Sequence, residues 1–475
     1  MKYREFAAKL LIFTLLLFHG NVQAQIAAET KKVMEKGEFN QARKEIKKQC
    51  DGKGDFSSDE LEIFLATMER IEIDFSKTEE QILAELSPYF PGIQKNDLRK
   101  WEHEKKLEMR IIDGERRYFR NAVPNLFRVD SAAHRAKIQR DGVPDNSLDR
   151  LRIKHTSGIV SSVLNRSKSD ETTQKFRIEF SMKLKPGVVP AGEIVRCWMP
   201  FPRESLPRQK NVNYLEGNYM LGKNQLQNAL YAEKKVKKGK PTEFLYTAEF
   251  ETSAQWFNLK PEDIFPYKKN SELYKQYTAE RPPHIVFSDT IKRLAEEIAN
   301  GINNPLEKVK AIYYWIDAHI PWASALEYSI MENIPHYVIE NNKGDCGMKT
   351  LLFMSLARVS GIPCKWQSGW MLHPGEVNLH DWCEVYYEGV GWVPLDQSFG
   401  LQNSETKEIK EFYITGTDAY RLIINDDYSR EFNPPKQFYR SEPVDFQRGE
   451  MEWKGGNLYF DKWTYHMNVT YLNKE

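Results

Sequence analysis

The sequence predicts a multidomain α+β protein, because stretches of different periodicity follow one another along the chain. Residues 25–150 are charged and carry apolar residues at helical spacing. Residues 173–270 alternate apolar and polar residues in short runs, which is typical of half-buried strands. Residues 281–400 combine both patterns, and residues 401–475 return to strand-like runs. We therefore expect a mainly helical N-terminal region, a β-sandwich domain, a mixed helix-and-sheet domain and a β-rich C-terminal extension.

The overall composition sets two broad limits. The chain has 475 residues, a length that suggests about three domains. Its 68 Lys and Arg residues balance 67 Asp and Glu residues, so charge gives no case for nucleic-acid binding.

The N-terminus has the parts of a secretory signal peptide. Three basic residues accompany the apolar run 10–18, which is too short to span a bilayer. A cleavage motif of the small-x-small type ends at Ala24. We therefore expect residues 1–24 to be a signal peptide and the mature protein to be secreted or periplasmic, with no integral membrane segment.

The helical N-terminal region, residues 25–150, contains one clear hairpin signal. Asp113-Gly114 lies between the strand-like runs 107–112 and 116–120, and this dipeptide favours a two-residue hairpin turn. Helices followed by a hairpin resemble a winged-helix arrangement. In an exported protein, a structural or substrate-guiding role suits this region better than nucleic-acid binding. The polar stretch 146–172 is interpreted as a connector.

The strongest strand prediction covers residues 176–184. Five apolar residues alternate with polar ones in this run, namely Phe176, Ile178, Phe180, Met182 and Leu184. The runs 194–199 and 244–250 extend the pattern, and Gly and Pro residues lie between them, which is typical of a β-sandwich. Such a domain suits a protein or carbohydrate ligand, but no residue in it marks a site.

A candidate nucleophile lies at the start of a predicted helix after the loop 323–342. Asp345 is a good N-cap for a helix over 348–359, which ends near Gly361-Ile362-Pro363. Cys346 would then lie in the first turn, where free backbone N–H groups and the helix dipole favour the thiolate.

A candidate base and a candidate acid lie on strands predicted after this helix. Strand alternation over residues 379–387 places His380 on one face and Asp381 on the other. A further strand ends at Asp396. His373, in the predicted loop 373–378, is the competing histidine.

Together, Cys346, His380 and Asp396 have the chemistry of an acyl-transfer triad. The thiolate attacks a carbonyl, the imidazole exchanges the proton, and the carboxylate fixes the imidazole tautomer. A cysteine or a histidine taken alone at such a position is usually a core residue. The order and spacing of all three residues favour a catalytic site.

This stretch resembles the transglutaminase-like superfamily, whose core is similar to that of papain-type cysteine proteases. The resemblance covers about residues 282–400. It implies that Cys346, His380 and Asp396 are the catalytic residues. The matching motifs are Gly344-Asp345-Cys346, Gly361-Ile362-Pro363, His380-Asp381-Trp382-Cys383-Glu384, Gly391-Trp392 and Asp396.

The resemblance implies an exported cysteine enzyme that forms a thioester with an amide or peptide substrate. Water would resolve the thioester in an amidase or peptidase, and an amine would resolve it in a transglutaminase. Both remain open, with a slight preference for hydrolysis. The triad needs no metal or cofactor, and the sequence has no acidic spacing like that of a calcium loop. The alternative is an inactive transglutaminase-like scaffold that binds protein or carbohydrate.

The second oxyanion donor is left open by the sequence. The backbone N–H of Cys346 is one expected donor. Relatives use an aromatic or polar side chain upstream of the cysteine, and here Trp322, Tyr328 and His336 compete.

The cysteine count is odd, because the chain has five cysteines. This number is consistent with one free reactive thiol and up to two disulfides. Cys197, Cys364 and Cys383 lie in strand-like runs, so we expect them to be buried as reduced thiols.

Overall fold

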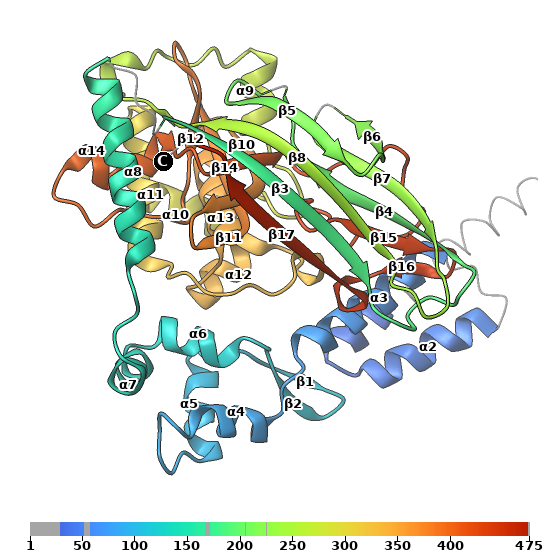
Figure 1. Ribbon diagram of the computed structural model, residues 1–475. Coiled ribbons are helices and arrows are strands. Elements are labelled where there is room, and N and C mark those ends of the chain that lie inside the picture. The colour runs from blue at the N-terminus through green and yellow to red at the C-terminus, as the bar shows by residue number, and fades with distance from the viewer. Residues whose placement is uncertain (1–28, 52–57, 167–171, 205, 225, 474–475) are drawn as a thin grey trace, which may run out of the picture. The chain divides into compact units, whose positions relative to one another are not determined.

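The structure is a computed structural model that describes residues 29–51, 58–166, 172–204, 206–224 and 226–473 (Figure 1). The predicted signal peptide, residues 1–24, lies outside these ranges. The chain divides into two compact units, and the division falls between Arg140 and Asp141.

The first unit is mainly helical and contains one short hairpin. Its elements are α2 (Phe39–Asp51), α3 (Ser58–Asp74), α4 (Glu79–Leu86), α5 (Lys95–His103), β1 (Met109–Ile112), β2 (Glu115–Tyr118), α6 (Ala122–Val129) and α7 (Ser131–Asp141). The predicted hairpin is confirmed, since Ile112 pairs with Glu115. Asp113 and Gly114 both have positive φ, 49° and 82°, which a two-residue turn of this hand requires. The winged-helix likeness stays a prediction.

Two antiparallel sheets of the second unit share one core. Their strands are β3 (Thr173–Leu184), β4 (Ile194–Phe201), β5 (Gln209–Glu216), β6 (Met220–Lys223), β7 (Asn228–Lys235), β8 (Glu243–Ser253), β15 (Glu450–Trp453), β16 (Gly456–Leu458) and β17 (Trp463–Tyr471). One sheet has the order β17-β3-β8-β5 and the other β16-β15-β4-β7-β6. All five alternating apolar residues of β3 are buried, so this strand prediction is confirmed.

The stretch 146–172, interpreted above as a polar connector, is instead largely the helix α8 (Ser147–Leu164). Ile159 and Val160 on this helix are buried in a small core with Phe412 and Tyr413. The prediction was wrong because two adjacent apolar residues anchor this helix, while most of its other positions are polar.

The part of the second unit that combines helices and strands is built on a four-stranded antiparallel sheet. Its strands are β10 (Cys364–His373), β11 (Glu376–Tyr387), β12 (Gly391–Leu395) and β14 (Arg421–Asn425), in the order β12-β11-β10-β14. The accompanying helices are α9 (Glu272–Thr278), α10 (Asp289–Ala299), α11 (Pro305–His319), α12 (Ile334–Asn341), α13 (Cys346–Val359) and α14 (Lys407–Lys410). The stretch 323–342, predicted as a loop, therefore contains α12.

Helix α13 is the centre of this part of the chain. Every residue of α13 from Gly347 to Arg358 is buried, and its apolar residues are not confined to one face of the helix. Its apolar side chains share a core with Trp366, Cys383 and Val385 of the four-stranded sheet. Trp370 and Leu422 of the same sheet belong instead to the core of the two antiparallel sheets. The four-stranded sheet therefore contributes to both cores.

The described part of the C-terminal extension, residues 401–473, contributes strands to four sheets (Figure 1), and its β13 (Gly416–Thr417) pairs with β9 (Gln255–Trp256) in a two-stranded sheet. β14 pairs with β10 in the four-stranded sheet. β15 pairs with β4, and β17 pairs with β3 along nine residue pairs from Trp463 to Tyr471. The last part of the chain thus ties the sheets of the second unit together.

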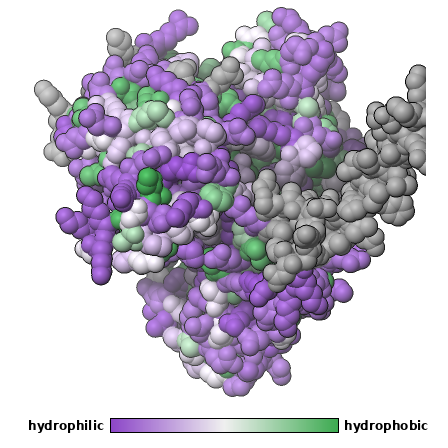
Figure 2. Space-filling model, turned by 90° about the vertical axis from the view of Figure 1, so that its right-hand side faces the viewer, coloured by the Kyte–Doolittle hydropathy of each residue, from purple (hydrophilic) through white to green (hydrophobic). Residues whose placement is uncertain are grey.

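The visible surface is mostly polar. Figure 2 shows hydrophilic residues over most of the face turned to the viewer, with hydrophobic residues singly or in small groups. None of the helices in the described part of the chain combines the length and the apolar character that crossing a membrane demands.

Candidate active site

Cys346 is the first residue of α13, as predicted. The Asp345 side chain caps the helix by accepting a hydrogen bond from the backbone N–H of Met348 at 3.0 Å. Cys346 is half-buried, whereas Cys197, Cys364 and Cys383 are buried, and all four are free thiols. Among these four cysteines, Cys346 is therefore the one that an external reagent or substrate reaches.

His380 and Asp396 are brought together by neighbouring strands. β11 and β12 are antiparallel, with Cys383 opposite Leu395, so Asp396 follows β12 beside His380. The two side chains are buried, and His380 Nε2 lies 2.8 Å from Asp396 Oδ2. Asp396 Oδ1 accepts the backbone N–H groups of Ser398 and Phe399 at 2.9 and 3.1 Å. These contacts fix the carboxylate on both oxygens.

A buried arginine from β14 completes this arrangement. Arg421 Nη1 lies 2.6 Å from Asp396 Oδ2, and its Nε lies 3.4 Å from Asp418 Oδ2. Asp418 in turn lies 3.3 Å from Nε2 of His373, the last residue of β10. The competing histidine therefore has its own carboxylate, and the guanidinium joins two histidine–carboxylate pairs.

The electrostatics of the His380 pair suit a neutral base. Burial alone would raise the pKa of Asp396, but His380 and Arg421 outweigh it and hold this pKa below its ordinary value. Burial lowers the pKa of His380, against the opposing effect of Asp396. A neutral His380 that donates Nε2–H to an ionised Asp396 has its lone pair on Nδ1. Nδ1 has no hydrogen-bond partner among the described residues.

Cys346 contacts a different carboxylate. Its Sγ donates to Asp381 Oδ2 at 3.5 Å, and none of its hydrogen bonds within the described ranges reaches His380. Strand alternation explains this, because His380 and Asp381 point to opposite faces of β11 and α13 packs on the face of Asp381 and Cys383. The structure thus joins His380 to Asp396 but does not join either of them to the thiol.

The expected stabilisation of a Cys346 thiolate is not observed. Burial, together with Asp381 and Asp345, raises the pKa of the Cys346 thiol well above its ordinary value. The two carboxylates oppose the favourable end of the helix dipole. The expectation of a low pKa, made from the helix start alone, is therefore wrong for this arrangement.

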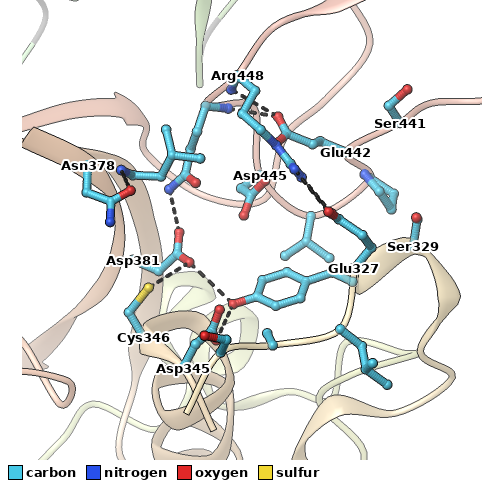
Figure 3. Close-up of a pocket in the computed structure, with 18 of the residues that line it drawn as sticks. Glu327, Ser329, Asp345, Cys346, Asn378, Asp381, Ser441, Glu442, Asp445 and Arg448 are labelled. Carbon is cyan, nitrogen blue, oxygen red and sulfur yellow. Dashed lines mark hydrogen bonds and ion pairs between the residues drawn. The ribbon is translucent and has the colours of Figure 1, made fainter. Parts of the chain in front are cut away.

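Cys346 lines a pocket of about 240 Å³ (Figure 3). Trp322 and Tyr328 also line it, whereas His336 does not; on α12 it lies 3.2 Å from Glu340. Trp322 and Tyr328 are therefore the two candidate side chains beside the thiol. The Tyr328 hydroxyl donates a hydrogen bond to Asp345 Oδ1 at 2.6 Å. Gly347 allows this crowding, because a Cβ there would meet the Tyr328 hydroxyl at 2.2 Å.

Several residues of this site were missed by the sequence analysis. Asp381 was assigned to the correct face of its strand, and its shared parity with Cys383 was the signal that it faces the helix. Gln447 had no such signal, because it lies far along the chain, yet its Nε2 donates to Asp381 Oδ1 at 2.7 Å. Arg421 and Asp445 likewise come from the C-terminal extension.

Replacing Arg421 by methionine should strongly destabilise the protein. Arg421 is 1% exposed, and its loss leaves Asp396 and Asp418 buried without their cation. We expect a loss of about 3–5 kcal/mol in the free energy of unfolding, measured by urea denaturation. Arg177→Met is the control, because its ion pair with Glu249 is exposed and should contribute less than about 1 kcal/mol. An equal effect of the two changes would contradict the central role of Arg421.

Replacing Asp381 by asparagine should lower the pKa of Cys346. The change removes a carboxylate that lies 3.5 Å from Sγ, so the thiolate forms at lower pH. Iodoacetamide labelling of Cys346, followed by peptide mass spectrometry across pH, measures the midpoint. The wild-type midpoint should lie above about 8.5, the value of an unperturbed thiol.

The control for this labelling is Glu376→Gln, which removes an exposed carboxylate from the same strand. It should leave the midpoint unchanged. A wild-type midpoint well below neutrality, or no shift in Asp381→Asn, would show that Asp381 does not govern the thiol.

Comparison with known proteins supports a family assignment for one part of the chain. Residues 292–397 match the profile of the transglutaminase-like superfamily. A mouse protein called kyphoscoliosis peptidase is 26% identical over 187 residues, which cover 35% of this chain and 28% of that protein. This chain thus spans little more than a quarter of the mouse protein.

Two bacterial proteins match longer parts of the chain. An uncharacterized protein of Haemophilus influenzae is 25% identical over 302 residues, with 52% of this chain and 78% of that protein covered. A crystal structure from Cytophaga hutchinsonii, described as a candidate cysteine protease, superposes with a TM-score of 0.43 and 14% identity. It covers 64% of this chain and 92% of its own. On the profile match to residues 292–397, the chain carries a domain of the transglutaminase-like superfamily.

Proposed function

We propose that the chain is a cysteine enzyme that acts on amide or peptide bonds through a thioester at Cys346. The observation that carries the proposal is the buried hydrogen bond of 2.8 Å between His380 Nε2 and Asp396 Oδ2. It sets the tautomer in which Nδ1 is free to accept a proton. The half-buried thiol at the start of α13, in a pocket open to substrate, supports the same assignment.

The raised pKa of Cys346 favours general-base catalysis over a preformed ion pair. In the first step, the Cys346 proton moves to His380 Nδ1 as Sγ forms a bond to the carbonyl carbon. In the structure Sγ contacts Asp381, which points to the opposite face of β11 from His380. This step therefore requires Cys346 to move until Sγ reaches Nδ1. The imidazolium then protonates the leaving amine as the C–N bond breaks, and Asp396 stabilises its charge.

The second half of the reaction regenerates the thiol. Water or an amine attacks the thioester carbonyl and gives its proton to His380. The C–S bond then breaks to release the product, and His380 returns that proton to Sγ. The backbone N–H of Cys346, together with Trp322 or Tyr328, would stabilise the oxyanion in both halves. Hydrolysis is the favoured outcome, and transfer to an amine remains part of the proposal.

Removing any of the three residues should abolish turnover. We expect Cys346→Ala, His380→Asn and Asp396→Asn each to lower kcat by about 10³-fold or more, because they act as one unit. Release of new amino termini from a peptide mixture measures hydrolysis, and incorporation of a fluorescent alkylamine measures transfer. Cys197→Ala is the control, since it removes a buried sulfur from the core of the two antiparallel sheets. Activity that survives in Cys346→Ala would refute the thioester.

The proposal includes export of the mature enzyme to the periplasm or the medium. It rests on the charged and apolar run before Ala24 in the sequence. Edman sequencing of the protein recovered from the cell exterior or periplasm should begin at Gln25. Recovery of the chain only from the cytoplasm, with Met1 retained, would contradict export.

A further inference from the structure

The pocket beside Cys346 carries a strong excess of carboxyl groups. Nineteen residues line it, and its charged members are five carboxyl side chains and one guanidinium. The carboxyl groups belong to Glu327, Asp345, Asp381, Glu442 and Asp445, and the guanidinium belongs to Arg448. An excess of this kind makes the inside of the pocket negative to the extent that these carboxyl groups are ionised.

The single guanidinium is fully occupied by two of the carboxylates. Arg448 Nη2 lies 2.8 Å from Glu327 Oε2, and Arg448 Nε lies 2.5 Å from Glu442 Oε1. Figure 3 shows Arg448 between these two side chains. Arg448 therefore offsets one of the two negative charges of Glu327 and Glu442, and it forms no ion pair with the other three carboxyl groups that line the pocket.

Asp345 and Asp381 have hydrogen-bond donors. Asp345 Oδ1 accepts from the Tyr328 hydroxyl and from the backbone of Met348, and Asp381 Oδ1 accepts from Gln447. These neutral donors satisfy the carboxyl oxygens but do not cancel their charge.

Asp445 differs from both. It is 7% exposed, and it makes no hydrogen bond or ion pair with any residue in the described ranges. Figure 3 shows it in the middle of the pocket, with its carboxyl group facing the open space and no dashed line reaching it. Its carboxyl oxygens therefore face the pocket without a protein donor or cation, and they are available to water or to a ligand.

The pKa values of these carboxyl groups also favour a cation in the pocket. Burial, with further contributions from Glu442 and Asp381, raises the pKa of Asp445. Burial also raises the pKa of Asp345 to about 6. A positive group placed among them would relieve the repulsion and restore the ionised forms.

The walls of the pocket suit an alkyl chain. Leu326, Leu379 and Val444 line it together with the indole of Trp322, which is 40% exposed. Apolar walls that lead to a carboxylate are suited to a methylene stem with a charged end, and an indole face also attracts cations.

We propose that this pocket binds a protonated amine or guanidinium carried on an alkyl chain, with Asp445 as its counter-ion. The inference rests on the proposed function, in which Cys346 is the acylated residue. The cation would be a basic side chain beside the acylated bond or the amine that resolves the thioester. In either case, Asp445 is a specificity-determining residue for a cationic substrate.

Charged thiol reagents test the pocket without any need for turnover. Cys346 is labelled with methanethiosulfonates that carry a 2-aminoethyl, a 2-hydroxyethyl or a 2-sulfonatoethyl group, and peptide mass spectrometry gives each rate. Each rate is divided by that of 2-mercaptoethanol with the same reagent. The ratio of the cationic to the neutral reagent then cancels the pKa of the thiol itself.

We expect this ratio to be about tenfold or more in the wild type, with the sulfonate slowest. Asp445→Asn should lower it by about threefold to tenfold, because a unit charge is removed from a poorly solvated pocket. Asp289→Asn is the matched control, since Asp289 is an exposed carboxylate at the start of α10 and does not line the pocket. A wild-type ratio near one, or a ratio that survives in Asp445→Asn, overturns the proposal.

Thermal unfolding of Asp445→Asn separates a binding role from a structural one. Since Asp445 has no partner to lose, its neutral isostere should unfold at the same temperature or higher. A clear fall in the unfolding temperature, together with the lost ratio, would assign Asp445 a structural role and overturn the inference.

Two further arms distinguish the sources of the cation and the two hypotheses. Faster hydrolysis of lysine peptides than of their norleucine counterparts, lost in Asp445→Asn, identifies a substrate side chain. A raised KM for cadaverine in Asp445→Asn identifies the acceptor amine. If the protein hydrolyses peptides but shows no charge selectivity, the proposed enzymatic function stands and the proposed cation site is refuted. If labelling is charge-selective and depends on Asp445 but the protein turns over no substrate, the cation site stands and the proposed enzymatic function is refuted.

Discussion

The buried guanidinium of Arg421 is the interaction on which the candidate site depends. It lies within ion-pair distance of Asp396 and Asp418, and each of these carboxylates has its own histidine. Two buried carboxylates and two imidazoles would be very unfavourable without a fixed cation among them. Because guanidinium stays ionised at any relevant pH, it keeps Asp396 ionised and leaves His380 neutral. Arg421 thus acts together with burial and with the His380–Asp396 contact itself to set the charge of this pair.

The surroundings of the Cys346 thiol differ from those of His380, because carboxyl groups lie beside the thiol. Cys346 lies at a helix start, which favours negative charge, but Asp345 and Asp381 place more negative charge beside it. Gly347 makes this possible, since any side chain there would exclude the Tyr328 hydroxyl and the Asp381 carboxylate. The site thus combines a base that is ready to accept a proton with a thiol that retains its own.

Local sequence signals predicted those parts of the fold and of the site that neighbouring residues define. Asp345 as a helix cap, the turn at Asp113-Gly114 and the alternation along β11 all rest on interactions within a few residues, and the structure confirms them. The consequence of that alternation was missed, because parity assigns faces but does not say which face a distant helix covers. Residues 146–172 showed no helical pattern of apolar residues, because the buried side chains of α8 include only two apolar ones, Ile159 and Val160, and are otherwise polar. Arg421, Asp445 and Gln447 come from residues far along the chain, and no periodicity links them to Cys346.

The path of the C-terminal extension has a consequence for biosynthesis. A nascent chain that ends at Leu395 already contains the thiol and the imidazole, but it lacks Arg421, Gln447 and the strands that join the sheets. The charge pattern described here can form only after Arg448 has been made, because Arg421, Asp445 and Arg448 all come from the C-terminal extension. Assembly from distant parts of the second unit would therefore delay completion of this site until synthesis is almost complete. A protein that can attack amide bonds would gain from this order, since its own unfolded chain is rich in such bonds.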